Sequence, residues 1–416
     1  MANTHLPQII TSYLDNDLYK FTMNMVNLHQ FPDYTVEWTY KNRNPDVKFT
    51  QEMIDEINYQ IDLYCNLRYQ KNELDYLRTK VRFLKYDFVD MLTLWHAQRD
   101  QITCVLDPEK MQPEIHFRGP NWQVSWYEVP VMAIVAEVYF RMHYTTEEQA
   151  EAINEAKRRL DDKIKWLNET KHNIGNFSEF GTRRRFSKEF QDYAVGTLSK
   201  WQFMHAKFVG TSNVYLAMKY GIMPSGTTAH EETMLIGQGN PKINPAYSNY
   251  YFMQAWHKEY GTDNGILLTD TIGTDVCLKD INKAEAILWS GYRHDSGDPF
   301  VWGEKILAML VKFGIDTRTK TLLFSDSLNF KKAADIYERF SGRCNVAFGI
   351  GTWLVTDTTI PAMNQVIKLT EVNGIPVCKL SDAPVDPLTG LPEKYMGKDV
   401  TYATNLAAQI KWRLEH

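Results

Sequence analysis

Short apolar segments alternate with amphipathic stretches through the second half of the chain, from about residue 175 onward. Each apolar segment ends in a polar or glycine-bearing cluster, at residues 180–183, 209–213, 268–271, 293–298, 324–327 and 348–352. Alternating strands and helices predict a parallel sheet. Polar groups gathered at successive strand ends favour a (β/α) barrel, whose active site lies on that face, over an open sheet. A doubly wound sheet remains an alternative, because it also binds ligands beyond the carboxyl ends of its strands.

The first 145 residues show a different pattern, rich in aromatic and charged residues and poor in glycine. They predict a helix over about 16–29 and strands near 35–40 and 113–117. Thr145 and Glu148 then form a capping-box signature, which predicts the start of a helix. Apolar residues at spacings of three and four make that helix long and amphipathic: Ala150, Ile153, Ala156, Leu160, Ile164 and Leu167. We therefore predict an α/β protein with a mixed α+β N-terminal domain at residues 1–145 and an irregular (β/α) barrel at residues 146–369.

Composition narrows the class of protein. The 416 residues are 44% hydrophobic and 13% aromatic, which is typical of a well-packed globular protein and excludes disorder. A net charge of −5 gives no general attraction to nucleic acid or to an anionic membrane. The five cysteines form no CxxC pair, and no signal peptide or membrane span is visible. These features predict a cytoplasmic enzyme.

The run from Arg293 to Asp298 is the richest in chemistry. It places an arginine, a histidine, two carboxylates, a serine and a glycine in one loop after an apolar segment. Carboxylates suit ribose hydroxyls or magnesium, and the arginine suits an anion. The run therefore predicts a site for a phosphorylated sugar, with a salt-bridged turn as the alternative.

A second candidate site for phosphate lies at residues 349–352. Gly349 and Gly351 would expose backbone N–H groups, and Thr352 adds a hydroxyl. Ser325 and Asp326 end the preceding strand and offer further ligands. We expect a phosphate cradle here, and a tight turn is the alternative.

Three further residues have simpler alternative explanations. Arg183, in a run of three arginines after Gly181, could bind a planar carboxylate or pair with surface acids. His230 is followed by two acids, which would orient its ring, but a surface histidine at a helix start explains it as well. Tyr19 lies at the start of the first helix, where packing alone accounts for it.

Taken together and in order, these motifs resemble nicotinate phosphoribosyltransferases of the bacterial and yeast type. The matching segments span nearly the whole chain: residues 14–20, 180–186, 209–213, 226–230, 293–299, 324–326, 348–352 and 379–382. The resemblance implies formation of nicotinate mononucleotide and pyrophosphate from nicotinate and phosphoribosyl pyrophosphate. It also implies magnesium, coupled ATP hydrolysis through a phosphohistidine, and a homodimer. The segment 370–416 would then rejoin the N-terminal domain.

The resemblance also implies a role for each site residue. His230 is similar to the phosphorylated histidine, and Tyr19 to the ring-stacking tyrosine that reaches into the site of a dimer partner. The catalytic residues would be His230, Asp295 and Asp298, with the two aspartates placed for ribose and magnesium. Nicotinate would contact Tyr19, Arg183, Thr227 and Arg293, and phosphate or ribose would contact Ser325, Asp326, Gly349, Gly351 and Thr352.

Three other functions remain open. The nicotinamide-specific relative shares the Arg-x-Asp-Ser-Gly-Asp run, but an amide substrate needs no compensating cation. A type I phosphoribosyltransferase is less favoured, because its signature needs adjacent acids and residues 266–271 supply only Asp270. An inactive barrel used for binding would not need His230, Asp295 and Asp298 together.

Overall fold

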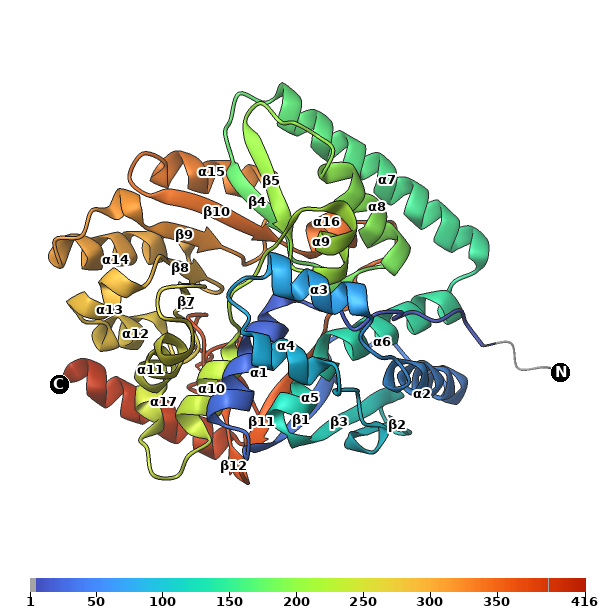
Figure 1. Ribbon diagram of the computed structural model, residues 1–416, viewed down its shortest axis with the longest axis horizontal. Coiled ribbons are helices and arrows are strands. Elements are labelled where there is room, and N and C mark those ends of the chain that lie inside the picture. Colours follow the sequence, from blue (N-terminus) through green and yellow to red (C-terminus); the bar gives the residue numbers. More distant parts are fainter. Residues whose placement is uncertain (1–4, 388) are drawn as a thin grey trace.

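The computed structural model describes residues 5–387 and 389–416 and contains two main sheets (Figure 1). The smaller sheet is antiparallel and has the order β12-β11-β1-β3-β2. Its strands are β1 (Thr35–Asn42), β2 (Ile102–Asp107), β3 (Gln112–Pro120), β11 (Gln365–Val372) and β12 (Ile375–Pro376). Strand β11 comes from late in the chain, yet it pairs with β1 from Val36↔Val372 to Asn42↔Gln365. Segments from both ends of the sequence therefore build this sheet.

Helices of the N-terminal part pack around the antiparallel sheet. They are α1 (Leu18–Gln30), α2 (Gln51–Cys65), α3 (Lys71–Lys80), α4 (Tyr86–Leu92), α5 (Asn121–Val124) and α6 (Glu128–His143). Every residue of α6 from Glu128 to Phe140 is buried. This explains its continuous apolar sequence, because a helix covered on all sides needs no polar face.

The larger sheet is parallel and curled, in the order β6-β5-β4-β10-β9-β8-β7. Its strands are β4 (Gly175–Glu179), β5 (Ala206–Thr211), β6 (Met223–Pro224), β7 (Ile266–Leu268), β8 (Gly291–His294), β9 (Thr321–Phe324) and β10 (Asn345–Ile350). In the described part of the chain β6 and β7 are the two edges, so the barrel is open. The predicted fold class, an irregular (β/α) barrel with a mixed α+β N-terminal region, is confirmed.

The remaining helices connect these strands or cover the sheets. They are α7 (Thr146–Glu169), α8 (Lys188–Leu198), α9 (Val214–Tyr220), α10 (His230–Gln238), α11 (Ser248–Tyr260), α12 (Thr274–Asp280), α13 (Lys283–Leu288), α14 (Pro299–Lys312), α15 (Phe330–Phe340), α16 (Thr352–Val355) and α17 (Val400–Glu415). A short pair, β13 (Cys378–Lys379) and β14 (Met396–Gly397), precedes α17. No described helix is both long and apolar enough to cross a membrane.

The elements predicted from sequence pattern form close to their expected bounds. The first helix begins at Leu18, two residues inside the prediction, because Asp17 adopts an extended conformation and precedes the first turn. The Thr145 capping box is present: the Thr145 hydroxyl accepts from the Glu148 N–H at 3.2 Å, and the Glu148 carboxylate accepts from the Thr145 N–H at 2.8 Å. The buried stripe of α7 starts at Ala152, whereas Ala150 is exposed.

Candidate active site

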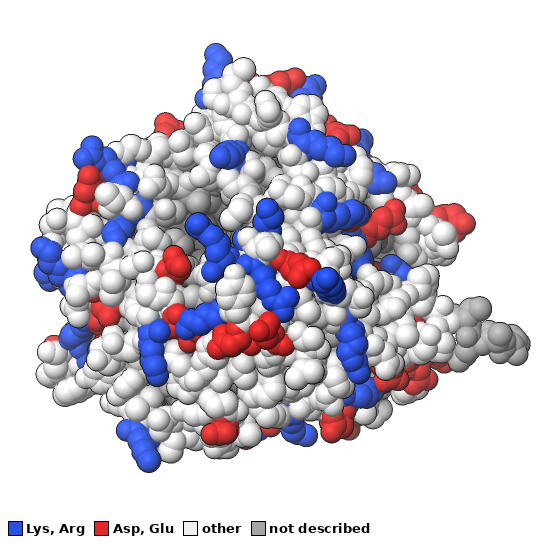
Figure 2. Space-filling model, in the orientation of Figure 1, with Lys and Arg blue, Asp and Glu red and all other residues white. Residues whose placement is uncertain are grey.

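A cavity of about 630 Å³ lies where the carboxyl ends of the parallel strands face helices α1, α6 and α10. Figure 2 shows a hollow near the middle of one face of the molecule, with Lys and Arg side chains around it. Thr227 and Asp298 are the two predicted site residues that do not line this cavity. The other ten all line it: Tyr19, Arg183, His230, Arg293, Asp295, Ser325, Asp326, Gly349, Gly351 and Thr352. The fold therefore brings together residues separated by more than 300 positions in the sequence.

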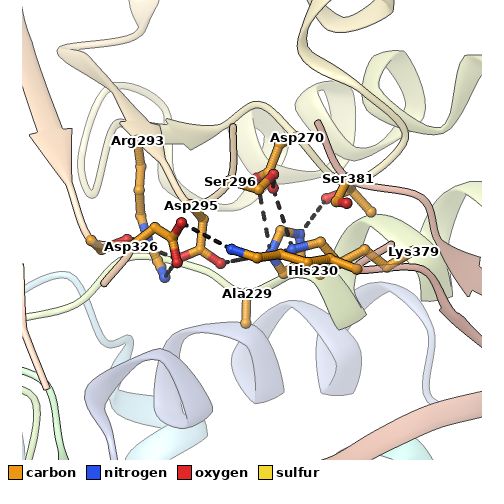
Figure 3. Close-up of polar contacts among 12 residues, drawn as sticks. Ala229, His230, Asp270, Arg293, Asp295, Ser296, Asp326, Lys379 and Ser381 are labelled. Atoms are coloured by element: carbon orange, nitrogen blue, oxygen red, sulfur yellow. Dashed lines mark hydrogen bonds and ion pairs between the residues drawn. The ribbon is translucent and has the colours of Figure 1, made fainter. Parts of the chain in front are cut away.

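His230 lies at the centre of a buried polar cluster (Figure 3). It is the first residue of α10, and its ring contacts the loops after two strands. Nδ1 lies 3.0 Å from the Thr271 hydroxyl, and Nε2 lies 3.0 Å from Asp295 Oδ2. The Lys379 ammonium lies 2.7 Å from Nε2. His230 is thus a histidine held on both ring nitrogens, not a surface residue.

The surroundings of His230 favour its neutral form. Burial and the adjacent Lys379 ammonium lower its pKa to about 4, although Asp270 and Asp295 oppose this shift. The Lys379 ammonium can only donate, whereas the ionised Asp295 carboxylate can only accept, so these two neighbours of Nε2 favour opposite tautomers of the ring. In either tautomer the neutral ring keeps one unprotonated nitrogen.

Asp295 and Arg293 form the second part of this cluster. Asp295 Oδ1 accepts from Arg293 at 3.1 Å and from the Ser325 hydroxyl at 2.8 Å. Although burial opposes ionisation, Arg293 and His230 hold the pKa of Asp295 well below its usual range. Arg293 also donates to Ser325 Oγ and to the Thr228 carbonyl, both at 2.9 Å. The arginine is locked in place by three partners from different loops.

Asp270 completes a set of groups that fit a divalent cation. Ligand atoms of His230, Asp270 and Asp295 lie within 4.8 Å of one another. Asp270 Oδ1 is buried and has no hydrogen-bond partner among the described residues, while Oδ2 accepts from the Ser296 hydroxyl. Carboxylate oxygens are the ligands that magnesium prefers. Lys379 now lies 3.3 Å from Asp270 Oδ2, so a cation here would share these oxygens with the ammonium.

The glycines of the 349–352 loop allow close packing at the end of β10. A Cβ at Gly349 would overlap the Phe180 ring, and one at Gly351 would lie 2.9 Å from the Phe180 carbonyl oxygen. Both glycines and Thr352 still face the cavity. Close packing against Phe180 is thus one reason for glycine at these two positions, and the predicted phosphate cradle is a second.

Two predicted residues lie elsewhere. Asp298 is exposed and caps α14, where its carboxylate accepts from the N–H groups of Phe300 and Val301 at 2.8 and 2.9 Å. It does not line the cavity, so the geometry gives no support to its predicted catalytic and magnesium role. Thr227 is buried, and its carbonyl accepts from the Thr22 hydroxyl at 2.9 Å. Its own hydroxyl has no partner among the described residues.

Sequence reasoning missed several charged residues of the cavity wall. Among those that line it are Glu128, Glu231, Lys368 and Lys379. Lys20 is fully buried and bridges the first two, 2.7 Å from Glu128 and in contact with Glu231. Lys20 and Lys379 fall inside segments that we noted for their resemblance. Glu231 was expected to orient the His230 ring, but its carboxylate contacts Lys20 instead. Glu128 and Lys368 lie in helix α6 and strand β11, where no local pattern marks them.

Two models of one protein family match most of the chain. The N-terminal domain model of the nicotinate phosphoribosyltransferase family matches residues 14–136, and the main model of the same family matches residues 176–402. The chain belongs to the nicotinate phosphoribosyltransferase family. Residues of both matched regions line the cavity.

Curated members of the nicotinate phosphoribosyltransferase family are similar over nearly their full length. The nicotinate phosphoribosyltransferase of Cupriavidus necator is 42% identical over 399 residues, which cover 96% of this chain and 97% of the relative. That of Xylella fastidiosa is 42% identical over 378 residues, covering 90% of this chain and 93% of the relative.

Solved structures of the family share the fold. The nicotinate phosphoribosyltransferase of Vibrio cholerae superimposes with a TM-score of 0.88 at 32% identity, covering 98% of this chain and 95% of that chain. The enzyme of Porphyromonas gingivalis superimposes with a TM-score of 0.87 at 30% identity, covering 96% of this chain and 100% of that chain.

Proposed function

We propose that this protein makes nicotinate mononucleotide and pyrophosphate from nicotinate and phosphoribosyl pyrophosphate, for NAD biosynthesis. We further propose that ATP hydrolysis is coupled to this reaction through phosphorylation of His230. The observation that carries the coupling is the position of His230, which lines the cavity with its Nε2 3.0 Å from Asp295 Oδ2 and 2.7 Å from the Lys379 ammonium. Family membership supports the transfer reaction itself.

A neutral imidazole is a competent nucleophile toward phosphorus. The unprotonated ring nitrogen of His230 would attack the γ-phosphorus of ATP, and ADP would leave with the electrons of the broken P–O bond. The contact between Nδ1 and the Thr271 hydroxyl orients the ring during this step. Lys379, whose ammonium lies 2.7 Å from Nε2, can then donate to the phosphoryl oxygens. Hydrolysis of the phosphohistidine by water would return His230 to its starting state.

Transfer to nicotinate needs no protein nucleophile, because the ring nitrogen of nicotinate attacks C1 of the ribose directly. The transition state carries positive charge on the sugar, as in glycoside cleavage. Ionised Asp295 is placed to stabilise that charge. Asp270 and Asp295 would hold magnesium, which supplies charge neutralisation for the leaving pyrophosphate. The loop at Gly349, Gly351 and Thr352 would anchor the 5′-phosphate.

The cavity wall favours an acid over an amide. Arg183 and Lys368 both line it, and burial together with Arg183 lowers the pKa of Lys368 to about 7. Crowded cations of this kind are stabilised by an anionic ligand. Nicotinate provides that charge and nicotinamide does not. We therefore place nicotinate ahead of the amide.

The decisive experiment measures product from magnesium phosphoribosyl pyrophosphate with nicotinate or nicotinamide, each with and without ATP. We expect nicotinate mononucleotide that increases with ATP, together with stoichiometric ADP. Product from nicotinamide instead would move the protein to the amide-specific relative. ATP-independent formation of nicotinate mononucleotide would leave the transfer activity standing and remove the proposed role of His230.

We also propose that the protein works as a cytoplasmic homodimer. All five cysteines are free and buried, as suits a reducing compartment. Tyr19 lines the cavity of its own chain and donates to its own Glu128 at 3.3 Å, so a partner's Tyr19 would have to exchange with it or enter at another point. Mixing two variants, Tyr19→Ala and His230→Ala, tests sharing. Recovered ATP-stimulated turnover supports a shared site, and its absence in a proven dimer excludes one.

A further inference from the structure

Glu128 lies where side chains from three separate elements meet. It is the first residue of α6, and 2% of its side chain is exposed. Its Oε2 accepts from the Tyr19 hydroxyl at 3.3 Å and from the Lys20 ammonium at 2.7 Å, and its Oε1 lies 3.6 Å from Arg183. Both Tyr19 and Arg183 line the cavity, one from helix α1 and the other from the loop after β4. A single carboxylate thus contacts two lining residues that come from different elements.

The charge of Glu128 is maintained by its neighbours. Burial raises its pKa, but Lys20 and Arg183 lower it below the usual range, so the group is ionised. A carboxylate in the wall of a cavity that receives an acid opposes the charge of that acid. Its favourable contribution must therefore come from the groups that it holds, since its own charge works against the ligand.

We propose that Glu128 is a positioning residue for nicotinate, and that it fixes the Tyr19 ring and the Arg183 guanidinium relative to each other. The inference rests on the proposed function of the same cavity. Arginine has several rotatable bonds, and ordering it during binding costs free energy. An arginine that is already anchored on Glu128 loses less freedom when the nicotinate carboxylate arrives. The Tyr19 hydroxyl, held by the same carboxylate, sets the plane against which the ring can stack.

Glu128→Gln is the first test, because glutamine keeps the size and one neutral acceptor while removing the charge. We expect kcat/KM for nicotinate to fall about tenfold, mainly through KM, which is the order expected for losing one hydrogen bond to a charged group. KM for phosphoribosyl pyrophosphate and the amount of phosphoenzyme formed from ATP should stay within about twofold of wild type, since neither depends on the Tyr19–Arg183 geometry.

A double-variant cycle separates positioning from general damage. In an Arg183→Met background, Glu128→Gln should raise nicotinate KM by only about threefold, the part that comes from Tyr19, because the Arg183 partner is already absent. The matched control is Glu137→Gln on the same helix. Glu137 is also buried and ion-paired, with Arg141 at 2.8 Å, but it does not line the cavity. This control should lower stability without changing nicotinate KM.

Tyr19→Phe keeps the test informative if Glu128→Gln does not fold. It retains the ring and removes only the hydroxyl that Glu128 accepts, and we expect nicotinate KM to rise by about threefold or more. The inference is overturned by an unchanged or lower nicotinate KM in a folded Glu128→Gln protein, by equal losses in both backgrounds, or by an unchanged KM in Tyr19→Phe. Absence of nicotinate turnover in the wild-type protein would instead overturn the proposed function, and this inference with it.

Discussion

His230 and Glu231 are neighbours in the chain, yet their side chains belong to two different charge clusters. His230 joins Asp270, Asp295 and Lys379, which lie mostly on loops at the carboxyl edge of the parallel sheet. Glu231 joins Lys20 and Glu128, which lie on helices α1 and α6 of the N-terminal part. The first turn of α10 therefore connects two clusters. The His230 cluster contains groups that could bind a ligand, and in the Glu231 cluster the buried Lys20 is paired with two carboxylates. We infer that the carboxyl edge of the parallel sheet supplies the reacting groups, and that helices α1 and α6 hold the cavity side chains in position.

Removing the imidazole of His230 should give the largest expected effect, and it should be a loss of activity that changes in the Glu231 cluster do not cause. We expect His230→Ala to abolish phosphoenzyme formation and the stimulation by ATP, while weak transfer to nicotinate remains, because the carboxylates of Asp270 and Asp295 that would hold magnesium are retained. Radiolabelled ATP and product assays measure both quantities. Full ATP-coupled turnover in this variant would show that His230 is not the phosphate acceptor.

Breaking the second cluster should affect stability first. Lys20→Met leaves Glu128 and Glu231 buried without their shared cation, and loss of one partner from such a group costs about 3–5 kcal/mol. Urea unfolding measures the change. Lys305→Met is the control, because Lys305 pairs with Asp275 at 2.6 Å while the two side chains are 43% and 55% exposed, and such pairs contribute about 0–1 kcal/mol. Equal changes in unfolding free energy for Lys20→Met and for the control would show that the buried Lys20 cluster contributes no more than an exposed ion pair.

His230 and Glu231 should also change the free energy of unfolding in opposite directions as the pH rises. The pKa of His230 is lowered from 6.5 to about 4, chiefly by burial, so the unfolded chain binds the proton first and stability falls as pH falls through this window. The pKa of Glu231 is raised from 4.5 to about 7, chiefly by burial, so its contribution is present below 4.5 and is lost as pH rises toward 7. Each shift is worth on the order of 3 kcal/mol.

Replacing each residue alone tests these signs. We expect His230→Asn to flatten the acid side of a plot of unfolding free energy against pH, and Glu231→Gln to flatten its neutral side. Urea titrations at intervals between pH 4 and 8 provide the plot. If both variants flattened the same side, the two clusters would titrate as one unit.

The smallest effect is expected at Asp298, which the sequence placed in the catalytic set. Asp298→Ala removes the cap of α14 and should cost about 1 kcal/mol of stability, while Asp298→Asn should cost little, because asparagine caps equally well. Activity measured well below the unfolding temperature should be close to wild type in both. A large loss of turnover in the folded Asp298→Asn protein would restore the catalytic role that the sequence predicted.

The Asp295 and Asp298 pair shows how far sequence reasoning reaches. Both stand in one loop and are chemically alike, and the spacing alone does not tell a ligand-facing carboxylate from a helix cap. The backbone decides: Asp295 follows strand β8 and turns into the cavity, whereas Asp298 precedes Pro299 at the first turn of α14. Asp270 was passed over for the opposite reason, since a single acid after a strand carries little information until its neighbours are known.

The sequence by itself determined the alternation of strands and helices, the polar strand ends and the capping of α7, because these depend on residues close together in the chain. It also determined most of the barrel edge of the cavity, since parallel strands bring their carboxyl ends to one side. Only the tertiary structure decided the pairing of β11 with β1 and the meeting of Lys20, Glu128 and Glu231. These contacts join residues far apart in sequence, so they form only once the chain has folded. For the three charged residues, mutual attraction must then offset the cost of removing water from their charges.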